Sequence, residues 1–328
     1  MGHKTTRREF LKQMAITGAA LSAFPGVVEA AESAIKGANG KSRVVIATDS
    51  AVIKGNSEIV QSVLEKMLGK SVARLTDSKS GAAGWKKLFK PDDIVGIKVN
   101  CLFGKGVSTR PEMVDAVIAG LKMAGVREEN IIVWDRSSSD LIKAGFIPNK
   151  DGQGVKYIAD DGHWGETIES GAFKGHVTKV LSEKVTAIVN MPILKTHGMT
   201  GISCCLKNHY GSFDNPGSHH THNCNPAMAD FNALPLVKNK TRLVVVDALR
   251  PQYDGGPGLQ VRDQFNHYSL MVSTDPLAAD YQGLKIIEAK RQEMGMKPFT
   301  PEQLKWMEAA QERGVGTCDP GKIELLKV

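Results

Sequence analysis

The sequence is poor in cysteine, and the spacing of its cysteines excludes the common cysteine-based frameworks. Its 328 residues contain 5 cysteines, an odd number that does not indicate a disulfide framework, although an oxidising compartment would permit one bridge. No Cys-x2-Cys pair occurs, which excludes standard zinc modules and ferredoxin-type iron–sulfur modules. A four-cysteine iron–sulfur cluster stays an alternative, but it would have to gather Cys101, Cys204 or Cys205, Cys224 and Cys318 from distant loops.

Long apolar runs and basic runs are also missing. After residue 30, no stretch is long and apolar enough to span a bilayer, so we expect no permanent membrane anchor. The net charge of +7 comes from scattered lysines and arginines, and aromatic residues make up only 6% of the chain. Because nucleic-acid binding uses basic runs or aromatic platforms, we expect no nucleic-acid partner.

The first 30 residues have the pattern of an export signal. Arg7 and Arg8 precede a modestly apolar run (14–24), and small residues at 28 and 30 fit a signal-peptidase site. The alternative is an amphipathic helix with a chance arginine pair. We expect a twin-arginine signal peptide at 1–30, the twin-arginine translocase as a partner during export, and a periplasmic mature protein. Because this route exports folded chains, it favours a cofactor inserted beforehand.

Runs of β-branched residues alternate with segments of helical spacing along the rest of the chain. The predicted strands are 43–48, 93–101, 130–135, 185–190, 241–247 and 267–273, and the predicted helices are 56–68, 111–123, 276–291 and 301–313. Strand, helix and strand in this order predict right-handed crossovers and a parallel sheet. We expect a linker at 31–42 and then an α/β domain at 43–328. It would consist of two Rossmann-like lobes (43–180 and 181–328) with the site between them.

The expected site is built from the loops that follow the strands. In open parallel sheets, ligands bind at the carboxyl ends of the strands. Four of the predicted strands end in polar or glycine-containing loops, at 101–110, 135–140, 190–224 and 247–258. The third of these loops is the richest in chemistry, because residues 194–226 hold five of the nine histidines and three of the five cysteines.

This concentration of imidazole and thiol groups predicts a metal site. The two ligand types together favour zinc, copper, nickel or iron over calcium or magnesium, so we expect a transition metal without specifying which. The predicted ligands are His197, His209, His222 and Cys224. The alternatives are that Cys204 and Cys205 are core residues packed under a turn, and that the histidines at 219–222 belong to a solvated loop.

Polar residues at the same strand ends are candidates for catalysis and binding. His197 and Lys207 are the predicted catalytic pair, because histidine carries protons and a desolvated lysine acts as a base or holds an anion. At the start of a helix, Arg110 could grip an anionic ligand through two hydrogen bonds. The predicted cofactor-binding set is Arg110, Asn100, Asn208, Asp135 and Asp247. Internal ion pairs and strand-end capping are the alternatives for these residues.

Four sequence motifs resemble the DUF362 family. They are VNC followed by STRPEMV (99–101 and 108–114), VWDRS (133–137), VNMPILKTH (189–197) and LKNHYG (206–211). The resemblance covers about 43–290 and implies a widespread prokaryotic family of unassigned function, in which some members carry ferredoxin-like modules. Members often have Thr or Gly in place of Cys204 and Cys205, so the resemblance implies no ligand role for these cysteines.

A second likeness concerns layout alone. Thr109-Arg110-Pro111 before a helix, and a histidine (His197) ten residues ahead of Lys207, are similar to the nickel-pincer lactate racemase family. That resemblance implies a pincer nucleotide attached to the lysine. This chain departs from that family's pattern at two places: Ser203-Cys204-Cys205 replaces a glycine-rich run, and Val107 stands where an acidic residue is expected. The resemblance therefore leaves open whether this chain binds the same cofactor.

Together these features lead to two functional hypotheses. The first is a periplasmic, metal- or cofactor-dependent enzyme or redox protein that acts on a small anionic ligand, with a redox partner. The second is a non-catalytic metal- or anion-binding protein, or an accessory protein of an exported redox complex. Both fit the residues of the loop at 190–224.

Overall fold

The structure is a computed structural model that describes residues 37, 40–55 and 57–328. The expected signal peptide (1–30) and most of the expected linker lie outside the described residues. None of the helices in the described part has the length and apolar character that a membrane span requires.

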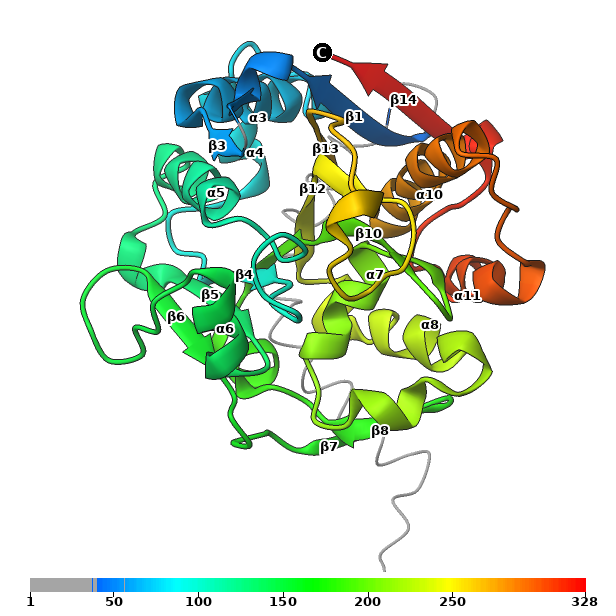
Figure 1. Cartoon of the computed structure of the whole chain (residues 1–328). Coiled ribbons are helices and arrows are strands. Elements are labelled where there is room, and N and C mark those ends of the chain that lie inside the picture. The colour runs from blue at the N-terminus through cyan, green and yellow to red at the C-terminus, as the bar shows by residue number, and fades with distance from the viewer. Residues whose placement is uncertain (1–36, 38–39, 56) are drawn as a thin grey trace, which may run out of the picture.

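A ten-stranded sheet forms the centre of the molecule (Figure 1). Its strands are β1 (Ser42–Thr48), β4 (Val95–Val99), β5 (Ile131–Asp135), β6 (Lys156–Ala159), β9 (Ala187–Met191), β10 (Ile193–His197), β11 (Gly201–Ser203), β12 (Thr241–Gln252), β13 (Ser269–Ser273) and β14 (Ile323–Lys327). The order is β14-β1-β13-β12-β9-β4-β5-β6, with β10 beside β12 and β11 beside β10. Most pairs are parallel, and β13 is antiparallel to both its neighbours. The predicted α/β fold with a mostly parallel sheet is confirmed.

The two halves of the chain share this sheet. Strand β9, from the second half, lies between β4 and β12, while β1, from the first half, lies between β13 and β14. The described strands therefore do not separate into one lobe at 43–180 and another at 181–328. The loops expected to form the site therefore follow strands of one common sheet.

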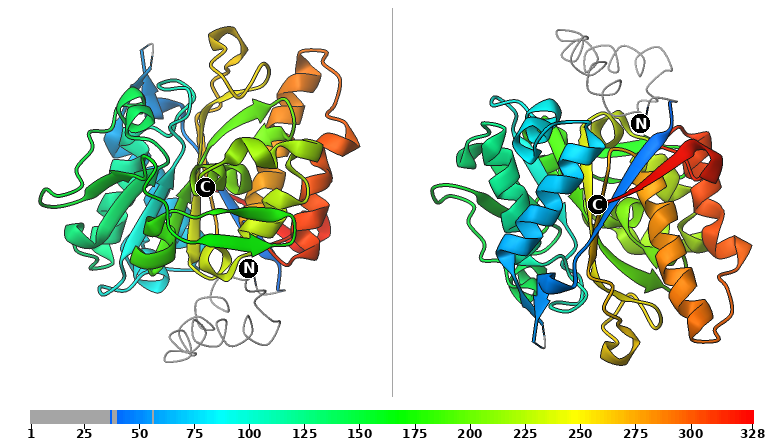
Figure 2. Two further views of the ribbon diagram at one scale, coloured as in Figure 1. Left: turned by 90° about the horizontal axis from the view of Figure 1, so that it is seen from below. Right: turned by 90° about the horizontal axis from the view of Figure 1, so that it is seen from above.

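Helices cover both faces of the sheet (Figure 2). One face carries α3 (Gln61–Leu75), α4 (Gly81–Leu88), α5 (Pro111–Met123) and α6 (Ser138–Ala144). The other carries α7 (Cys205–Asn208), α8 (Ala227–Asn232), α9 (Pro235–Lys238), α10 (Pro276–Glu293) and α11 (Pro301–Glu312). Strand residues alternate between the two cores: Val44 faces one and Val45 the other. Both faces are buried, which explains why the strands are continuous apolar runs.

Shorter elements complete the chain. Two hairpins pair β2 (Ile53–Lys54) with β3 (Glu58–Ile59) and β7 (Thr167–Ser170) with β8 (Phe173–His176). Single helical turns are η1 (Ser50–Val52), η2 (Glu128–Asn130), η3 (Val180–Lys184), η4 (His209–Gly211), η5 (Pro216–His219), η6 (Thr221–Cys224), η7 (Val261–Asp263) and η8 (Pro320–Lys322). Three of these turns, η4 to η6, lie in the histidine-rich loop.

The two ends of helix α5 are determined by particular residues in its sequence. Pro111 occupies the first turn, where its missing N–H costs no hydrogen bond. Gly125, with φ of 94°, follows the last turn in a left-handed conformation that suits glycine. The helix places Arg110 at its amino end, beside the carboxyl ends of the strands.

Candidate functional site

The candidate site lies where β4, β9 and β12 end. These strands are parallel neighbours, so their carboxyl ends meet at one edge of the sheet. Strand β10 begins just after β9, separated by Pro192 alone, and pairs with β12. Strand β10 carries Lys195 and His197 beyond the carboxyl end of β9. Figure 1 shows the loop after β4 (100–110) and the loop after β12 (253–264) side by side near β10, and Gln264 Nε2 donates to Gly106 O at 2.6 Å between them.

Lys195 is a buried ammonium group that joins β10 to the loop after β4. Its Nζ donates to Asn100 Oδ1 at 3.1 Å and to Val107 O at 2.7 Å. The residue is only 2% exposed, and desolvation lowers its pKa to about 7. Asn100, which was predicted to bind a ligand, thus accepts a hydrogen bond from Lys195. Lys195 was not predicted as a site residue, although its position next to the apolar Ile193 and Leu194 was a signal.

Lys207 lies on α7 beside an imidazole. Its Nζ is 3.1 Å from His220 Nε2 and 3.3 Å from the centre of the Tyr210 ring. The Nδ1 atom of His220 lies 2.7 Å from Pro216 O, which can only accept, so Nδ1 carries the proton and Nε2 accepts from Lys207. Burial lowers the pKa of Lys207 to about 8.

His197 stacks on this pair. Its ring centre is 5.8 Å from that of His220, with 18° between the planes. Burial and then the charge of Lys207 lower its pKa to about 3, so the ring is neutral near pH 7. Met199 N donates to its Nδ1 at 3.2 Å, which leaves the proton on Nε2. The predicted catalytic residues His197 and Lys207 are therefore neighbours, with His220 between them.

Arg110 lies on the other side of the loop after β4. It forms an ion pair with the buried Asp247, and Asp247 Oδ1 also accepts from Leu249 N at 3.1 Å. Arg110 lines a cavity of about 610 Å³ together with Lys105 and Arg250. This predicted anion-binding residue is thus partnered internally, and neither His197 nor Lys207 is among the residues that line its cavity.

A second buried charge network lies beneath the site. Lys98 Nζ donates to Asp135 Oδ1 at 2.9 Å, and Asp135 Oδ2 accepts from Cys101 N at 2.6 Å. Both charged residues are buried. Asp135, predicted to bind a cofactor, forms the internal ion pair that was its alternative, and it fixes the start of the loop after β4.

Two asparagines attach α7 to the strand ends. Asn208 Nδ2 donates to Lys98 O at 3.0 Å and to Asn190 Oδ1 at 2.7 Å, and Asn190 Nδ2 donates to Cys205 O at 2.9 Å. Asn208, predicted to bind a cofactor, thus positions the helix turn that carries Lys207.

The predicted metal ligands occupy different surroundings. His209 is buried, with Nδ1 3.2 Å from Ser212 Oγ, and burial lowers its pKa to about 3. Cys224 is buried, and burial raises the pKa of its thiol, while His222 is exposed. Within the described residues, the structure does not gather His197, His209, His222 and Cys224 into one group.

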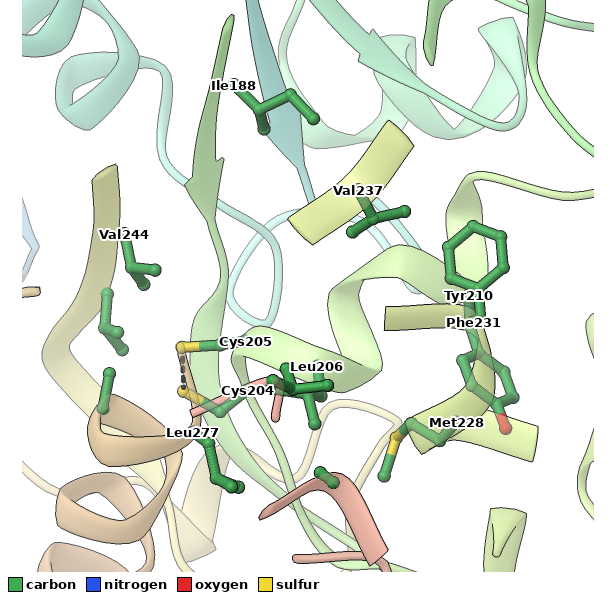
Figure 3. Packing of buried hydrophobic residues seen from close by; sticks show 14 of the residues in the cluster. Ile188, Cys204, Cys205, Leu206, Tyr210, Met228, Phe231, Val237, Val244 and Leu277 are labelled. Carbon is green, nitrogen blue, oxygen red and sulfur yellow. Dashed lines mark hydrogen bonds between the residues drawn. The ribbon is translucent and has the colours of Figure 1, made fainter. Parts of the chain in front are cut away.

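One other group could hold a metal ion. Ligand atoms of Cys204, Cys205 and Asp280 lie within 4.8 Å of one another, and the two sulfur atoms are 3.6 Å apart (Figure 3). Burial raises the pKa of Cys204 to about 11. Asp280 Oδ1 accepts from Cys205 N at 2.5 Å and Oδ2 from Leu206 N at 3.0 Å, so the carboxylate already caps the first turn of α7. Both thiols pack in the apolar core, which was the alternative to a ligand role for these two cysteines.

Comparison with known families identifies the chain. The family described as "Domain of unknown function (DUF362)" matches residues 95–285, a span that runs from β4 into α10 and includes the whole candidate site. The chain belongs to this family, which confirms the resemblance found in its motifs. No curated protein matches it.

One solved structure is similar in part. It is the crystal structure of a Thermotoga maritima protein from the Northeast Structural Genomics Consortium, with 12% sequence identity and a TM-score of 0.40. The match covers 77% of this chain and 59% of the other, so this chain spans about three fifths of its length. A similarity of this size carries no argument about function.

Proposed function

We propose that this protein is an enzyme that binds a small anionic ligand at His197, Lys207 and Lys195 and moves a proton to or from it. One observation carries the proposal. Lys195 and Lys207 are 2% and 8% exposed, and their described polar contacts are an amide oxygen, a carbonyl oxygen and an imidazole nitrogen. In the described part of the chain, neither forms an ion pair with a carboxylate, and the charge of Asp135 acts on Lys195 only from beyond contact distance.

Such an arrangement favours an anion as the missing partner. Removing an ammonium group from water costs several kcal/mol unless an opposite charge compensates it. Among the described residues, the other buried lysine and the buried arginine have carboxylate partners: Lys98 pairs with Asp135, and Arg43 pairs with Asp77 and Glu324. A carboxylate or phosphate near Lys207 would compensate its charge, and burial would strengthen the interaction.

The same residues are suited to proton transfer. The pKa of Lys207, lowered by burial to about 8, lies close to physiological pH, where a group can both take up and release a proton. The neutral His197 presents an Nε2–H donor that could stabilise negative charge on the ligand. We therefore assign Lys207 as the acid–base group and His197 as the hydrogen-bond donor.

Calorimetric titration with acetate and with inorganic phosphate tests the proposal. We expect the wild-type protein to bind at least one of them, and Lys207→Met to weaken binding by 10-fold or more, because it removes the charge. Lys66→Met, at an exposed position on α3, should bind as the wild type does. Equal binding by Lys207→Met, or no binding of either anion by the wild type, would refute the proposed site.

Metal binding is the second candidate function, favoured by the group of Cys204, Cys205 and Asp280. The protein would then be a metal-dependent enzyme, a redox protein with a partner, or a non-catalytic metal carrier. Elemental analysis of the purified protein, compared with Cys204→Ser and Cys205→Ser, tests this. A stoichiometric metal that both variants lose would support it, and a wild type free of metal would refute it.

Export is a further part of the proposal and rests on the arginine pair near the N-terminus. We infer a periplasmic protein carried by the twin-arginine translocase. Replacing Arg7 and Arg8 by lysine should leave the chain in the cytoplasmic fraction. Unchanged fractionation of this double variant would contradict twin-arginine export without affecting the ligand site.

A further inference from the structure

Four large apolar side chains are exposed around the candidate site. They are Leu102 (44% exposed), Phe103 (51%), Met199 (41%) and Leu259 (40%), and we call them the apolar collar. Single exposed apolar residues are ordinary on protein surfaces. These four differ because they come from three loops that all contact β10, the strand that carries Lys195 and His197.

Each loop is tied to the site by a specific contact. The ring centre of Phe103 is 5.9 Å from Lys195 Nζ. Met199 is joined to His197 through the hydrogen bond from its backbone N to Nδ1. The loop of Leu259 reaches β10 through Gly256 N, which donates to Thr196 Oγ1 at 3.1 Å. A Cβ atom on Gly106 would lie 3.1 Å from Leu259 Cδ1, so this leucine rests on the loop after β4.

The conformation of Phe103 adds a second observation. Its φ is 77°, in the left-handed region that bulky residues rarely adopt. An aromatic residue is thus held in a strained conformation with half of its surface in water. Strained backbone often persists at ligand-binding positions, where the surrounding structure maintains it.

We propose that the ligand is an organic anion with an apolar, preferably aromatic, body. Its carboxylate or phosphate group would pair with Lys207 and Lys195, and its body would pack on the apolar collar. This inference rests on the proposed function and specifies its substrate class. Burial of the body on the collar would add affinity that a bare anion lacks, in proportion to the apolar area removed from water.

Two matched pairs of probes test the inference by calorimetric titration: phenyl phosphate against inorganic phosphate, and benzoate against acetate. We expect the aromatic member of at least one pair to bind about tenfold more tightly, which corresponds to about 1.4 kcal/mol. Phe103→Ala and Met199→Ala should each reduce the affinity for the aromatic anion more than the affinity for the bare anion, and so reduce this preference. Met123→Ala is the control, because Met123 is similarly exposed (53%) but lies at the far end of α5, about 20 Å from Arg110 along the helix.

The outcomes separate this inference from the proposed function. If bare and aromatic anions bind equally well, or if both collar variants keep the aromatic preference, the inference is wrong and the anion site stands. If no anion binds, the proposed function fails, and the inference fails with it. Loss of all binding in a collar variant that still unfolds cooperatively would also overturn it, because the collar would then not be a separate apolar subsite.

Discussion

At the scale of residues, two buried lysines determine the character of the site. Lys195 and Lys207 lose their hydration on folding, and their described contacts are hydrogen bonds without an ion pair to a carboxylate. Desolvation is the main cause of the lowered pKa of each group. A lysine retained under these conditions costs stability, and a cost of this kind is common at functional sites.

Replacing Lys207 by methionine should therefore stabilise the free protein. Methionine has a similar length and needs no hydration, so we expect the free energy of unfolding to rise by about 1–2 kcal/mol at pH 7, net of the lost hydrogen bond to His220. Chemical denaturation of both proteins measures this difference. A clear loss of stability would mean that Lys207 has a structural role instead.

The stability difference should also depend on pH in a defined direction. The pKa of Lys207 is about 8 in the folded protein and about 10.4 in the unfolded chain, so between these values the unfolded state binds more protons. The stability of the wild type relative to Lys207→Met should consequently rise from pH 8 to pH 10. Denaturation curves at pH 7, 8, 9 and 10 measure it. A constant difference would contradict the lowered pKa.

At the scale of elements, the sequence predicted six strands of the central sheet but not β10 and β11, which are also buried and lie in the segment expected to be a loop (190–224). Strands β4, β5 and β9 match β-branched runs, and α5 matches its predicted bounds because proline and glycine mark its two ends. Helix α3 begins at Gln61 rather than 56, since the hairpin of β2 and β3 uses residues up to Ile59. The antiparallel direction of β13 depends on its neighbours, so its own residues could not indicate it.

The candidate site was predictable only in part, for a similar reason. The concentration of histidines and lysines pointed to the loop that carries His197 and Lys207. The partners of each group depend on contacts between distant segments, such as that of Lys195 with Val107. Sequence spacing also grouped His209 with His197, although the short turn at η4 places His209 against Ser212.

Gly211 follows α7 and touches the charge network beneath it. A Cβ atom at this position would lie 2.3 Å from Asp135 Oδ1 and 2.7 Å from Lys98 Nζ. Gly211→Ala should destabilise the protein by about 2–4 kcal/mol, because it overpacks the site of a buried ion pair. In Gly217→Ala, the new Cβ would lie 3.7 Å from Asn215 Oδ1, at ordinary van der Waals distance, so this control should change stability by less than about 0.5 kcal/mol. Thermal or chemical denaturation distinguishes the two, and equal effects would contradict the packing argument.

At the scale of the whole molecule, the two apolar cores hold the chain together as one unit. Each core contains residues from both halves of the chain: Ile132 and Met271 lie in one, and Val95 and Leu270 in the other. The central sheet connects them. A substitution that destabilises one half of the chain should therefore destabilise the other half as well.

Calorimetric unfolding of the protein tests this unity. We expect a single transition with equal calorimetric and van't Hoff enthalpies, because no half of the sheet has its own complete set of neighbours. Two separated transitions would show that the segments 43–180 and 181–328 unfold independently, as separate lobes would.

The position of β1 has a consequence for synthesis. This strand leaves the ribosome before both of its partners, because β13 and β14 follow all the other strands of the sheet in the chain. Until those strands are made, one β-strand close to the N-terminus has no permanent neighbour and is open to mispairing. A nascent chain therefore completes this part of the sheet only after Ile323–Lys327 has been made, and premature termination upstream of Ile323 would leave that edge unprotected.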